Sequence, residues 1–271
     1  MIEKRIGFIG AGNMGEAIIR GLLNSGLIDS KSIIASDSSE DRLQYLESTY
    51  HIETTKNNKH TAEHSDIIIL AIKPQIMGKV LEEIRSHVSE HKLIISIAAG
   101  ISLEQIKKIL PKEARIIRCM PNTPALVLKG MTVICSNDTN HEDILMAKHL
   151  FESVGTVLIL EEKFMDIVTA ISGSGPAYYF LILDSIADAG VKMGLSKSTA
   201  LLLATETMFG SACLLKEFKK HPAELKDMVT SPAGTTSYGL HKLEQSGIRG
   251  NLISAIEAAF NRSCELSLLK G

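Results

Sequence analysis

Two short segments of this chain combine residue types and spacing that could do chemistry. The first is the glycine loop, residues 10–15, in which Gly10, Gly12 and Gly15 form a G-x-G-x-x-G pattern. An apolar segment precedes the loop and an amphipathic one follows it. This context predicts a strand, a tight turn and a helix whose N-terminus binds the pyrophosphate of a dinucleotide, rather than a glycine-rich turn without a ligand. The loop therefore indicates a nicotinamide-dependent oxidoreductase.

The second segment is the 231–236 turn, which reads Ser-Pro-Ala-Gly-Thr-Thr. Proline at its second position and glycine at its fourth are typical of a type I turn, and Thr235 or Thr236 can then serve as the N-cap of the following helix. A turn that opens into a helix presents several backbone N–H groups, which suit a carboxylate ligand. From these residues alone, a plain N-cap without a ligand remains the alternative.

The elements that must position these segments follow from the hydrophobic pattern. Short apolar, β-branched segments alternate with amphipathic ones over the first part of the chain, which predicts βαβ units and a doubly wound, largely parallel sheet of the Rossmann-like α/β class. The expected strands are residues 5–9, 32–36, 66–72, 93–98, 115–119, 131–136 and 156–160. Helical patterns then continue to the end. We predict a dinucleotide-binding domain over 1–162 and a helical domain over 163–271.

Asp37 could decide which dinucleotide binds. It follows the second expected strand, 37 − 15 = 22 positions after Gly15, which is close to the spacing of the acidic residue that binds the adenosine ribose of NAD. A solvated aspartate that caps the next helix fits the same position. The residues that could instead bind the 2′-phosphate of NADP are Ser36, Ser38, Ser39 and Arg42. The choice between NAD and NADP is therefore left open.

Two later segments also end expected strands. Residues 71–74 and 98–100 place small residues and Lys73 where a parallel sheet binds its ligands, beyond the carboxyl ends of the strands. This position predicts that both lie beside the nicotinamide half of the cofactor. Ordinary turns between helix and strand are equally compatible with the spacing.

The composition favours a small-molecule partner. Among 271 residues, 29 basic and 31 acidic side chains give a net charge of −2, which predicts binding neither to nucleic acid nor to a membrane surface. The longest uncharged segment is broken by glycine and proline at 173–176, which argues against a membrane span. The start of the chain shows no secretory leader, so we expect a cytoplasmic protein.

Cysteine and histidine do not indicate a metal site. The four cysteines lie far apart and form no C-x-x-C pair, so we expect buried thiols. The histidine pairs 60/64 and 87/91 have the i, i+4 spacing of metal ligands, but their charged and polar neighbours favour solvated helix faces. We predict no metal. The four cysteines are Cys119, Cys135, Cys213 and Cys264.

The helical half carries more apolar surface than it can bury. Residues 178–189 and 201–215 are apolar around most of a helix circumference, and such helices must be covered. The helical half is too short to bury them alone, so we predict a homo-oligomer.

Four motifs along the chain together resemble the pyrroline-5-carboxylate reductase family. They are residues 10–15, Arg-Cys-Met-Pro-Asn-Thr-Pro at 118–124, Ser-Gly-Ser-Gly-Pro-Ala-Tyr at 172–178, and the stretch from 221 to 236. The resemblance implies reduction of 1-pyrroline-5-carboxylate to L-proline by NAD(P)H, the last step of proline biosynthesis. It also implies a Rossmann domain, a helical substrate and dimerisation domain, and homodimers that can assemble into a larger ring of dimers.

The resemblance further implies roles for single residues. Ser231 and the backbone amides around Gly234 and Thr235 would hold the substrate carboxylate, and the Thr236 hydroxyl would orient the ring nitrogen as the catalytic donor. Because a threonine hydroxyl is a poor acid at neutral pH, we expect the imine to arrive protonated. The expected cofactor-binding residues are Gly10, Gly12, Asn13, Met14, Gly15, Ser36, Asp37, Asn58, Ile72, Lys73, Ala99 and Asn122. An ordinary turn at 122–124 is the alternative for Asn122 and its neighbour Thr123.

The chain departs from the family pattern at two positions. Ala233 stands where many members have a second glycine, which should be tolerated if the backbone there is right-handed. Asp37 stands where several members have serine or a basic residue, which puts an NADPH preference in doubt.

Two other functions compete with this reading. Enzymes of the β-hydroxyacid dehydrogenase kind carry a lysine and an asparagine on the helix after the domain boundary, and residues 173–180 contain neither. A nucleotide sensor without catalysis would not explain the 231–236 turn.

Overall fold

The computed structural model describes residues 2–137 and 140–268, which form two compact units. The first unit consists of the described residues up to Ser174 together with those from Ala259 onward, and the second consists of Gly175–Ala258. The boundary at 162 and 163 expected from the change of pattern precedes this division and stays a prediction.

An eight-stranded sheet forms the centre of the first unit, with the strand order β3-β2-β1-β4-β5-β6-β7-β8. All neighbouring strands are parallel except β6 and β7, which pair antiparallel. The strands are β1 (Ile6–Ile9), β2 (Ile33–Ser36), β3 (Glu53–Thr55), β4 (Ile67–Leu70), β5 (Leu93–Ser96), β6 (Arg115–Met120), β7 (Gly130–Cys135) and β8 (Gly155–Ile159). The seven expected strands are all present, and their ends differ from the expected ones by at most two residues.

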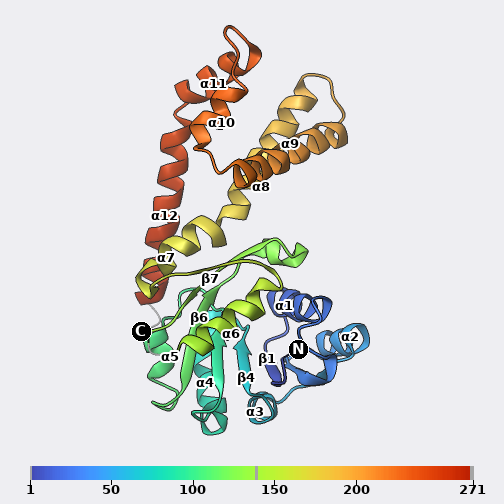
Figure 1. Ribbon diagram of the computed structural model, residues 1–271, viewed down its shortest axis with the longest axis vertical. Helices are drawn as coiled ribbons and strands as arrows, with labels where there is room; N and C mark the ends of the chain where they lie inside the picture. Colours follow the sequence, from blue (N-terminus) through green and yellow to red (C-terminus); the bar gives the residue numbers. More distant parts are fainter. Residues whose placement is uncertain (1, 138–139, 269–271) are drawn as a thin grey trace. The chain divides into compact units, whose positions relative to one another are not determined.

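Helices cover both faces of the sheet (Figure 1). In β1, Phe8 packs on the face covered by α1, α2 and α6, whereas Ile9 packs on the face covered by α3, α4 and α5. This alternation follows from the two-residue period of a strand. The helices are α1 (Asn13–Asn24), α2 (Glu40–Tyr50), α3 (Asn58–Glu63), α4 (Met77–Ile84), α5 (Leu103–Lys107), α6 (His141–Glu152) and α7 (Met165–Val168). The doubly wound layout is therefore confirmed.

The strand order reverses beside β1, which pairs with β2 on one side and with β4 on the other. In open parallel sheets, ligands bind outside the carboxyl ends of the strands at such a switch point. The glycine loop follows β1 directly and therefore lies at this point.

The second unit is entirely helical in its described elements. Its helices are α8 (Gly175–Lys192), α9 (Lys197–Phe218), α10 (Pro222–Met228), α11 (Thr235–Gln245) and the first part of α12 (Ile248–Leu268), which ends in the first unit. α8 and α9 pack closely where Gly190 faces Ala200, because a Cβ on Gly190 would lie 2.7 Å from the Ala200 Cβ. A turn of π-helix, Thr169–Gly173, precedes α8 and ends the first unit.

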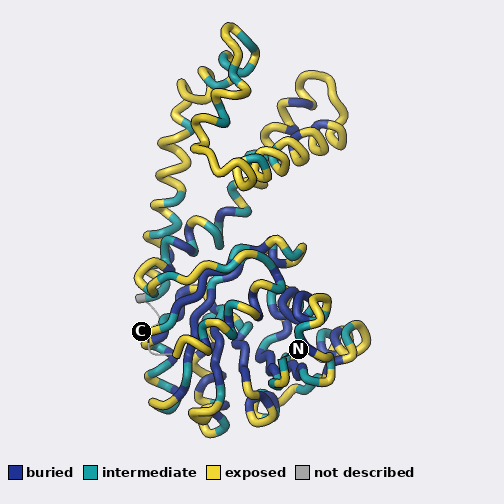
Figure 2. Tube along the Cα trace, viewed as in Figure 1, coloured by how far each residue is buried: buried dark blue, intermediate teal, exposed yellow. Residues whose placement is uncertain are grey.

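Large apolar side chains remain exposed on the second unit, whose trace is mostly yellow in Figure 2. Phe180 and Leu181 on α8 are 64% and 69% exposed, and Leu202 and Phe209 on α9 are 62% and 61% exposed. The prediction that this half cannot bury its own helices is therefore confirmed. Among the described residues, α9 is the one helix long and apolar enough to span a membrane, which is weak support for a span.

Candidate functional site

The glycine loop adopts a conformation that only glycine fits. Gly10 has a φ of 92°, and a Cβ there would lie 2.5 Å from the Ala71 carbonyl oxygen. A Cβ on Gly15 would lie 2.8 Å from the Gly10 carbonyl oxygen, so helix α1 can approach the end of β1 only without a side chain at this position. Both glycines are thus required by space, as a dinucleotide loop demands.

The N-terminus of α1 is open to an anion. Gly12 is its N-cap and supplies no side-chain cap, and a Cβ on Gly12 would meet nothing within 4 Å. In the described part of the chain, the amides of Asn13 and Met14 have no hydrogen-bond acceptor. Free N–H groups and the positive end of the helix dipole fit the pyrophosphate of a nicotinamide cofactor. The residues present therefore fit the group that the sequence motif implies.

Asp37 connects the end of β2 to the glycine loop. Its Oδ2 accepts a hydrogen bond of 2.9 Å from the Ala11 amide, and its Oδ1 accepts one of 3.0 Å from the Ser39 amide. Ser39 in turn caps α2 through its hydroxyl, which accepts from the Arg42 amide. The carboxylate is thus held in place at the strand end where this fold class binds the adenosine ribose.

Ser36, the last residue of β2, contacts Asn58, the first residue of α3. Ser36 is fully buried, and its hydroxyl donates to Asn58 Oδ1 at 2.8 Å. The Asn58 amide nitrogen donates to Glu83 Oε2 at 3.0 Å. Both side chains therefore bind protein atoms, and any role in cofactor binding stays a prediction.

The remaining expected cofactor residues follow β4, β5 and β6 along this edge. Lys73 is exposed at the start of a short helix after β4, and Ala99 is exposed after β5. Ile72 packs over the glycine loop, where a Cβ on Gly10 would lie 2.7 Å from its Cγ2. The structure brings these residues and the glycine loop to one edge of the sheet, although the sequence separates them widely.

Asn122 has a structural role. Its Oδ1 accepts from the Met131 amide at 2.8 Å, and its amide nitrogen donates to the Ser172 carbonyl at 3.1 Å. Through these two hydrogen bonds, Asn122 connects the start of β7 to the π-helical turn. The neighbouring Thr123 is exposed and begins a short 3-10 helix, Thr123–Val127.

The 231–236 turn in the second unit differs from the expected geometry. The Gly234 amide donates to the Ser231 carbonyl at 3.1 Å, which closes a four-residue turn. Ala233 has a φ of 56°, a left-handed conformation at the third position that is typical of a type II turn and incompatible with type I. The expectation of type I was wrong, and the condition for tolerating Ala233 is not met. Proline at the second position suits both types, so it could not discriminate between them.

The N-cap of α11 is Gly234, not a threonine. Thr235 and Thr236 occupy the first turn of the helix, and no acceptor for their amides and no partner for their hydroxyls exists among residues 2–137 and 140–268. A Cβ on Gly234 would lie 2.2 Å from Ser231 Oγ, so a side chain there would force the Ser231 hydroxyl to turn away. Free N–H groups and free hydroxyls therefore occur together in the first turn of α11, which can bind a carboxylate.

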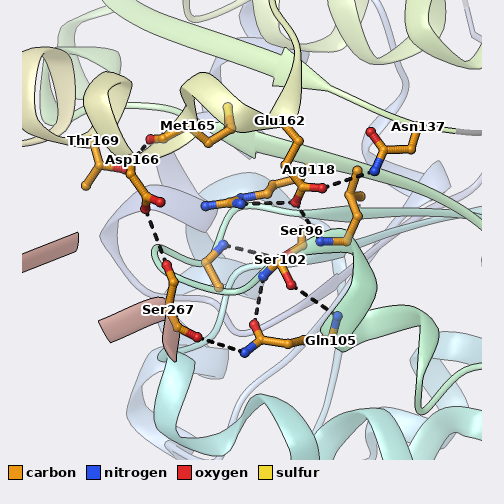
Figure 3. A network of polar contacts seen from close by, with 12 residues as sticks. Ser96, Ser102, Gln105, Arg118, Asn137, Glu162, Met165, Asp166, Thr169 and Ser267 are labelled. Carbon is orange, nitrogen blue, oxygen red and sulfur yellow. Dashed lines mark hydrogen bonds and ion pairs between the residues drawn. The ribbon is translucent and has the colours of Figure 1, made fainter. Parts of the chain in front are cut away.

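The first unit contains a polar network that was not predicted from the sequence (Figure 3). Arg118 in β6 is only 5% exposed, and its Nη1 lies 3.1 Å from Glu162 Oε1. The same carboxylate accepts hydrogen bonds from the Leu103 amide at 2.7 Å and from Asn137 at 3.1 Å. The one indication in the sequence was Arg118, a charged residue within an otherwise apolar part of β6. The network joins β6, α5 and the segment before α7.

The same network reaches the end of α12. Asp166 in α7 accepts hydrogen bonds from Ser263 at 2.7 Å and from Ser267 at 3.3 Å. Gln105 donates to the Ser267 carbonyl at 3.1 Å (Figure 3). These bonds fix the last turns of α12 to the first unit.

The cysteines are free thiols, but not all are buried. Cys119 and Cys135 are buried, and burial raises the pKa of both, to about 12 for Cys135. Cys264 is partly buried, whereas Cys213 on α9 is exposed because it lies on a face that this chain leaves uncovered. The expectation of four buried thiols was therefore wrong for Cys213. No group of three potential metal ligands exists in the described part of the chain.

Two family models match the chain. Residues 162–266 match the family described as pyrroline-5-carboxylate reductase dimerisation, and residues 5–100 match NADP oxidoreductase, coenzyme F420-dependent. Curated proteins named pyrroline-5-carboxylate reductase are similar over nearly the whole length. The one from Methanosarcina acetivorans is 41% identical and covers 98% of this chain and 99% of its own. The one from Synechocystis is 43% identical and covers 97% and 98%.

Solved structures agree with these matches. A Plasmodium falciparum pyrroline carboxylate reductase with NADP bound has a TM-score of 0.90 at 35% identity and covers 98% of this chain and 99% of its own. The enzyme from Coxiella burnetii has a TM-score of 0.92 at 36% identity with the same coverage. A 3-hydroxyisobutyrate dehydrogenase from Mycobacterium tuberculosis, at 12% identity and a TM-score of 0.53 over 72% of this chain and 67% of its own, shares the fold alone.

Proposed function

Because this chain belongs to the pyrroline-5-carboxylate reductase family, we propose that it reduces 1-pyrroline-5-carboxylate to L-proline with NAD(P)H. The observation that carries the proposal is the start of α11, where free amides and free hydroxyls meet a substrate's requirements for an anion receptor and a hydrogen-bond donor. The glycine loop supplies the cofactor site. The match of residues 5–100 to an NADP oxidoreductase family and the similar structure with NADP bound both support NADP as a cofactor.

The substrate carboxylate binds at the 231–236 turn. The amides of Thr235 and Thr236 and the Ser231 hydroxyl donate to it, and the positive end of the α11 dipole adds to the attraction. Gly234 leaves the Ser231 hydroxyl in this position, because a side chain at 234 would displace it.

The hydroxyl of Thr236 orients the ring nitrogen. A neutral hydroxyl holds the imine by a hydrogen bond at neutral pH but does not protonate it, so the proton arrives with the substrate. The nicotinamide, when bound, supplies the hydride to the imine carbon. The remaining work of the protein is to position the two reactants, which can contribute several powers of ten to the rate.

We also propose a cytoplasmic homodimer that assembles further into a ring of dimers. The match to a dimerisation family and the exposed apolar faces of α8 and α9 support a homo-oligomer. Covering of α9 by a second copy also explains why a helix of this length and composition need not enter a membrane. The four free thiols support a reducing compartment.

The test compares substrates with the purified chain. Incubation with 1-pyrroline-5-carboxylate and NADPH should lower the absorbance at 340 nm, whereas oxidation of 3-hydroxyacids by NADP⁺ should not raise it. Turnover of a 3-hydroxyacid without turnover of the imine would replace the proposal by a dehydrogenase function. Cofactor binding without either reaction would favour a nucleotide sensor.

A further inference from the structure

Glu16, the residue after the last glycine of the loop, joins a partly buried cluster with α2. Its Oε1 accepts hydrogen bonds from the hydroxyls of Tyr50 at 2.8 Å and Tyr45 at 3.1 Å. Its Oε2 forms an ion pair with Arg42. The exposed fraction is 16% for the Glu16 side chain and 24% for Arg42. All of these contacts connect residues that lie 26 or more positions apart.

Glu16 carries its full negative charge at neutral pH. Burial by itself raises the pKa of this carboxyl, but the hydrogen bonds from Arg42, Tyr50 and Tyr45 outweigh burial and lower the pKa below its usual value. The positive charge of Arg42 is therefore compensated at contact distance.

Two further hydrogen bonds of Arg42 lead back to the loop. Its Nε donates to the Ala11 carbonyl and its Nη2 to the Gly12 carbonyl at 3.5 Å, while its guanidinium lies 5.1 Å from the centre of the Tyr45 ring. An arginine near this strand end is the usual receptor for the 2′-phosphate of NADP. Here Nε and Nη2 of that arginine already bind protein atoms.

Asp37, which directly follows β2, places a carboxylate at the same strand end. Both oxygens of Asp37 accept backbone hydrogen bonds, and Asp37 forms no ion pair in the part of the chain that the structure describes. A carboxylate at this position suits the two hydroxyls of an unmodified ribose and repels a phosphate group.

We propose that Glu16 is a specificity-determining residue: by holding and neutralising Arg42, it prevents this arginine from favouring the 2′-phosphate, so that Arg42 gives no preference for NADP over NAD. The proposal rests on the proposed function for the identity of the cofactor. Glu16 acts through Arg42 and is a positioning residue.

The test measures equilibrium binding of NADP⁺ and NAD⁺ by isothermal titration calorimetry. In E16Q the amide keeps the shape and an acceptor for the tyrosines but removes the charge, so Arg42 is free to attract the phosphate. Coulomb attraction at such short range and intermediate dielectric predicts about three- to tenfold tighter binding of NADP⁺, with NAD⁺ unchanged. The gain should vanish in the double variant E16Q/R42Q.

Two further variants make the result decisive. E40Q removes a carboxylate from the exposed first turn of α2 and leaves the Glu16–Arg42 pair intact, so screening should keep its effect below about twofold. R42Q alone should also change the ratio of the two dissociation constants by less than about twofold, because the neutralised arginine contributes little.

The proposal is overturned if E16Q leaves the ratio unchanged or lowers it, or if the double variant keeps the gain. A large loss of NADP⁺ affinity in R42Q would overturn the proposal too, since Arg42 would then already bind the phosphate. If E16Q does not fold, the result for R42Q tests the proposal by itself. These binding ratios do not depend on turnover. Failure to reduce the imine would therefore overturn the proposed function and leave this result standing.

Discussion

Ala233 holds a left-handed backbone conformation in the turn that binds the substrate carboxylate in the proposed mechanism. This conformation costs a residue with a Cβ about 1–2 kcal/mol, whereas replacing alanine by glycine costs roughly 0.4–1 kcal/mol through the unfolded state. We predict that Ala233→Gly raises the free energy of unfolding by about 0.5–1 kcal/mol. Thermal unfolding at fixed protein concentration measures this change.

Ala212 provides the matched control, because it lies within the right-handed helix α9 and is exposed. Ala212→Gly should lower stability by about 1 kcal/mol. If both variants lost stability to the same extent, the backbone at Ala233 would not be strained in solution.

Thr236 provides the second test at this scale. Removal of a positioned donor costs about 10²–10³ in turnover, and we predict this loss in kcat for Thr236→Ala. Thr236→Ser keeps a hydroxyl and should retain most of the activity, while the affinity for NADP⁺ should stay unchanged in both variants. Kinetics near those of the wild type in Thr236→Ala would remove this hydroxyl from the mechanism.

The sequence predicts some of these residues well because their roles depend on local spacing. Gly10 and Gly15 are required by backbone geometry within a few residues of themselves. The ion pair between Glu16 and Arg42 could not be predicted, since it depends on how closely α2 packs beside α1.

Helix α12 shows how a single carboxylate can anchor an element. Asp166 accepts hydrogen bonds from Ser263 and Ser267, and bonds to a charged acceptor contribute about 1.5–3 kcal/mol each. We predict that Asp166→Ala increases amide hydrogen exchange in residues 259–268 by about tenfold or more, since about 1.4 kcal/mol corresponds to a factor of ten. Exchange followed by mass spectrometry of the C-terminal peptide measures it.

The control at this scale is Asp184→Asn on α8. It breaks an exposed ion pair with Lys197, in which the oxygen and nitrogen lie 2.6 Å apart, and exposed pairs contribute little to stability. Exchange in residues 259–268 should not respond to it. Equal acceleration in both variants would show that Asp166 does not act locally.

The elements most visible in the sequence are those with a regular apolar period. Strands β1, β4 and β5 are wholly buried and were expected within two residues of their ends. Strand β3 was missed because Glu53–Thr55 is a polar edge strand with no buried residue. The antiparallel pairing of β6 and β7 could not be inferred either, since period reveals a strand but not its direction.

At the scale of the whole molecule, the exposed apolar side chains of α8 and α9 require a second copy of the chain. Apolar surface of this extent is unfavourable in water and marks an interface. We predict that the protein sediments as a dimer or a larger assembly at micromolar concentration. A single species of monomer mass in analytical ultracentrifugation would contradict this.

The oligomer could be predicted from the sequence because the helices are apolar on too many sides for their number. The number of subunits could not, since it depends on the angle between copies and not on the amount of apolar surface.

The identity of the product tests the central claim most directly. The purified chain, given 1-pyrroline-5-carboxylate and NADPH or NADH, should form one L-proline for each reduced cofactor that is oxidised, as measured by chiral chromatography together with absorbance at 340 nm. Oxidation of cofactor without proline, or no reaction with either cofactor, would contradict the assignment of this chain as a pyrroline-5-carboxylate reductase.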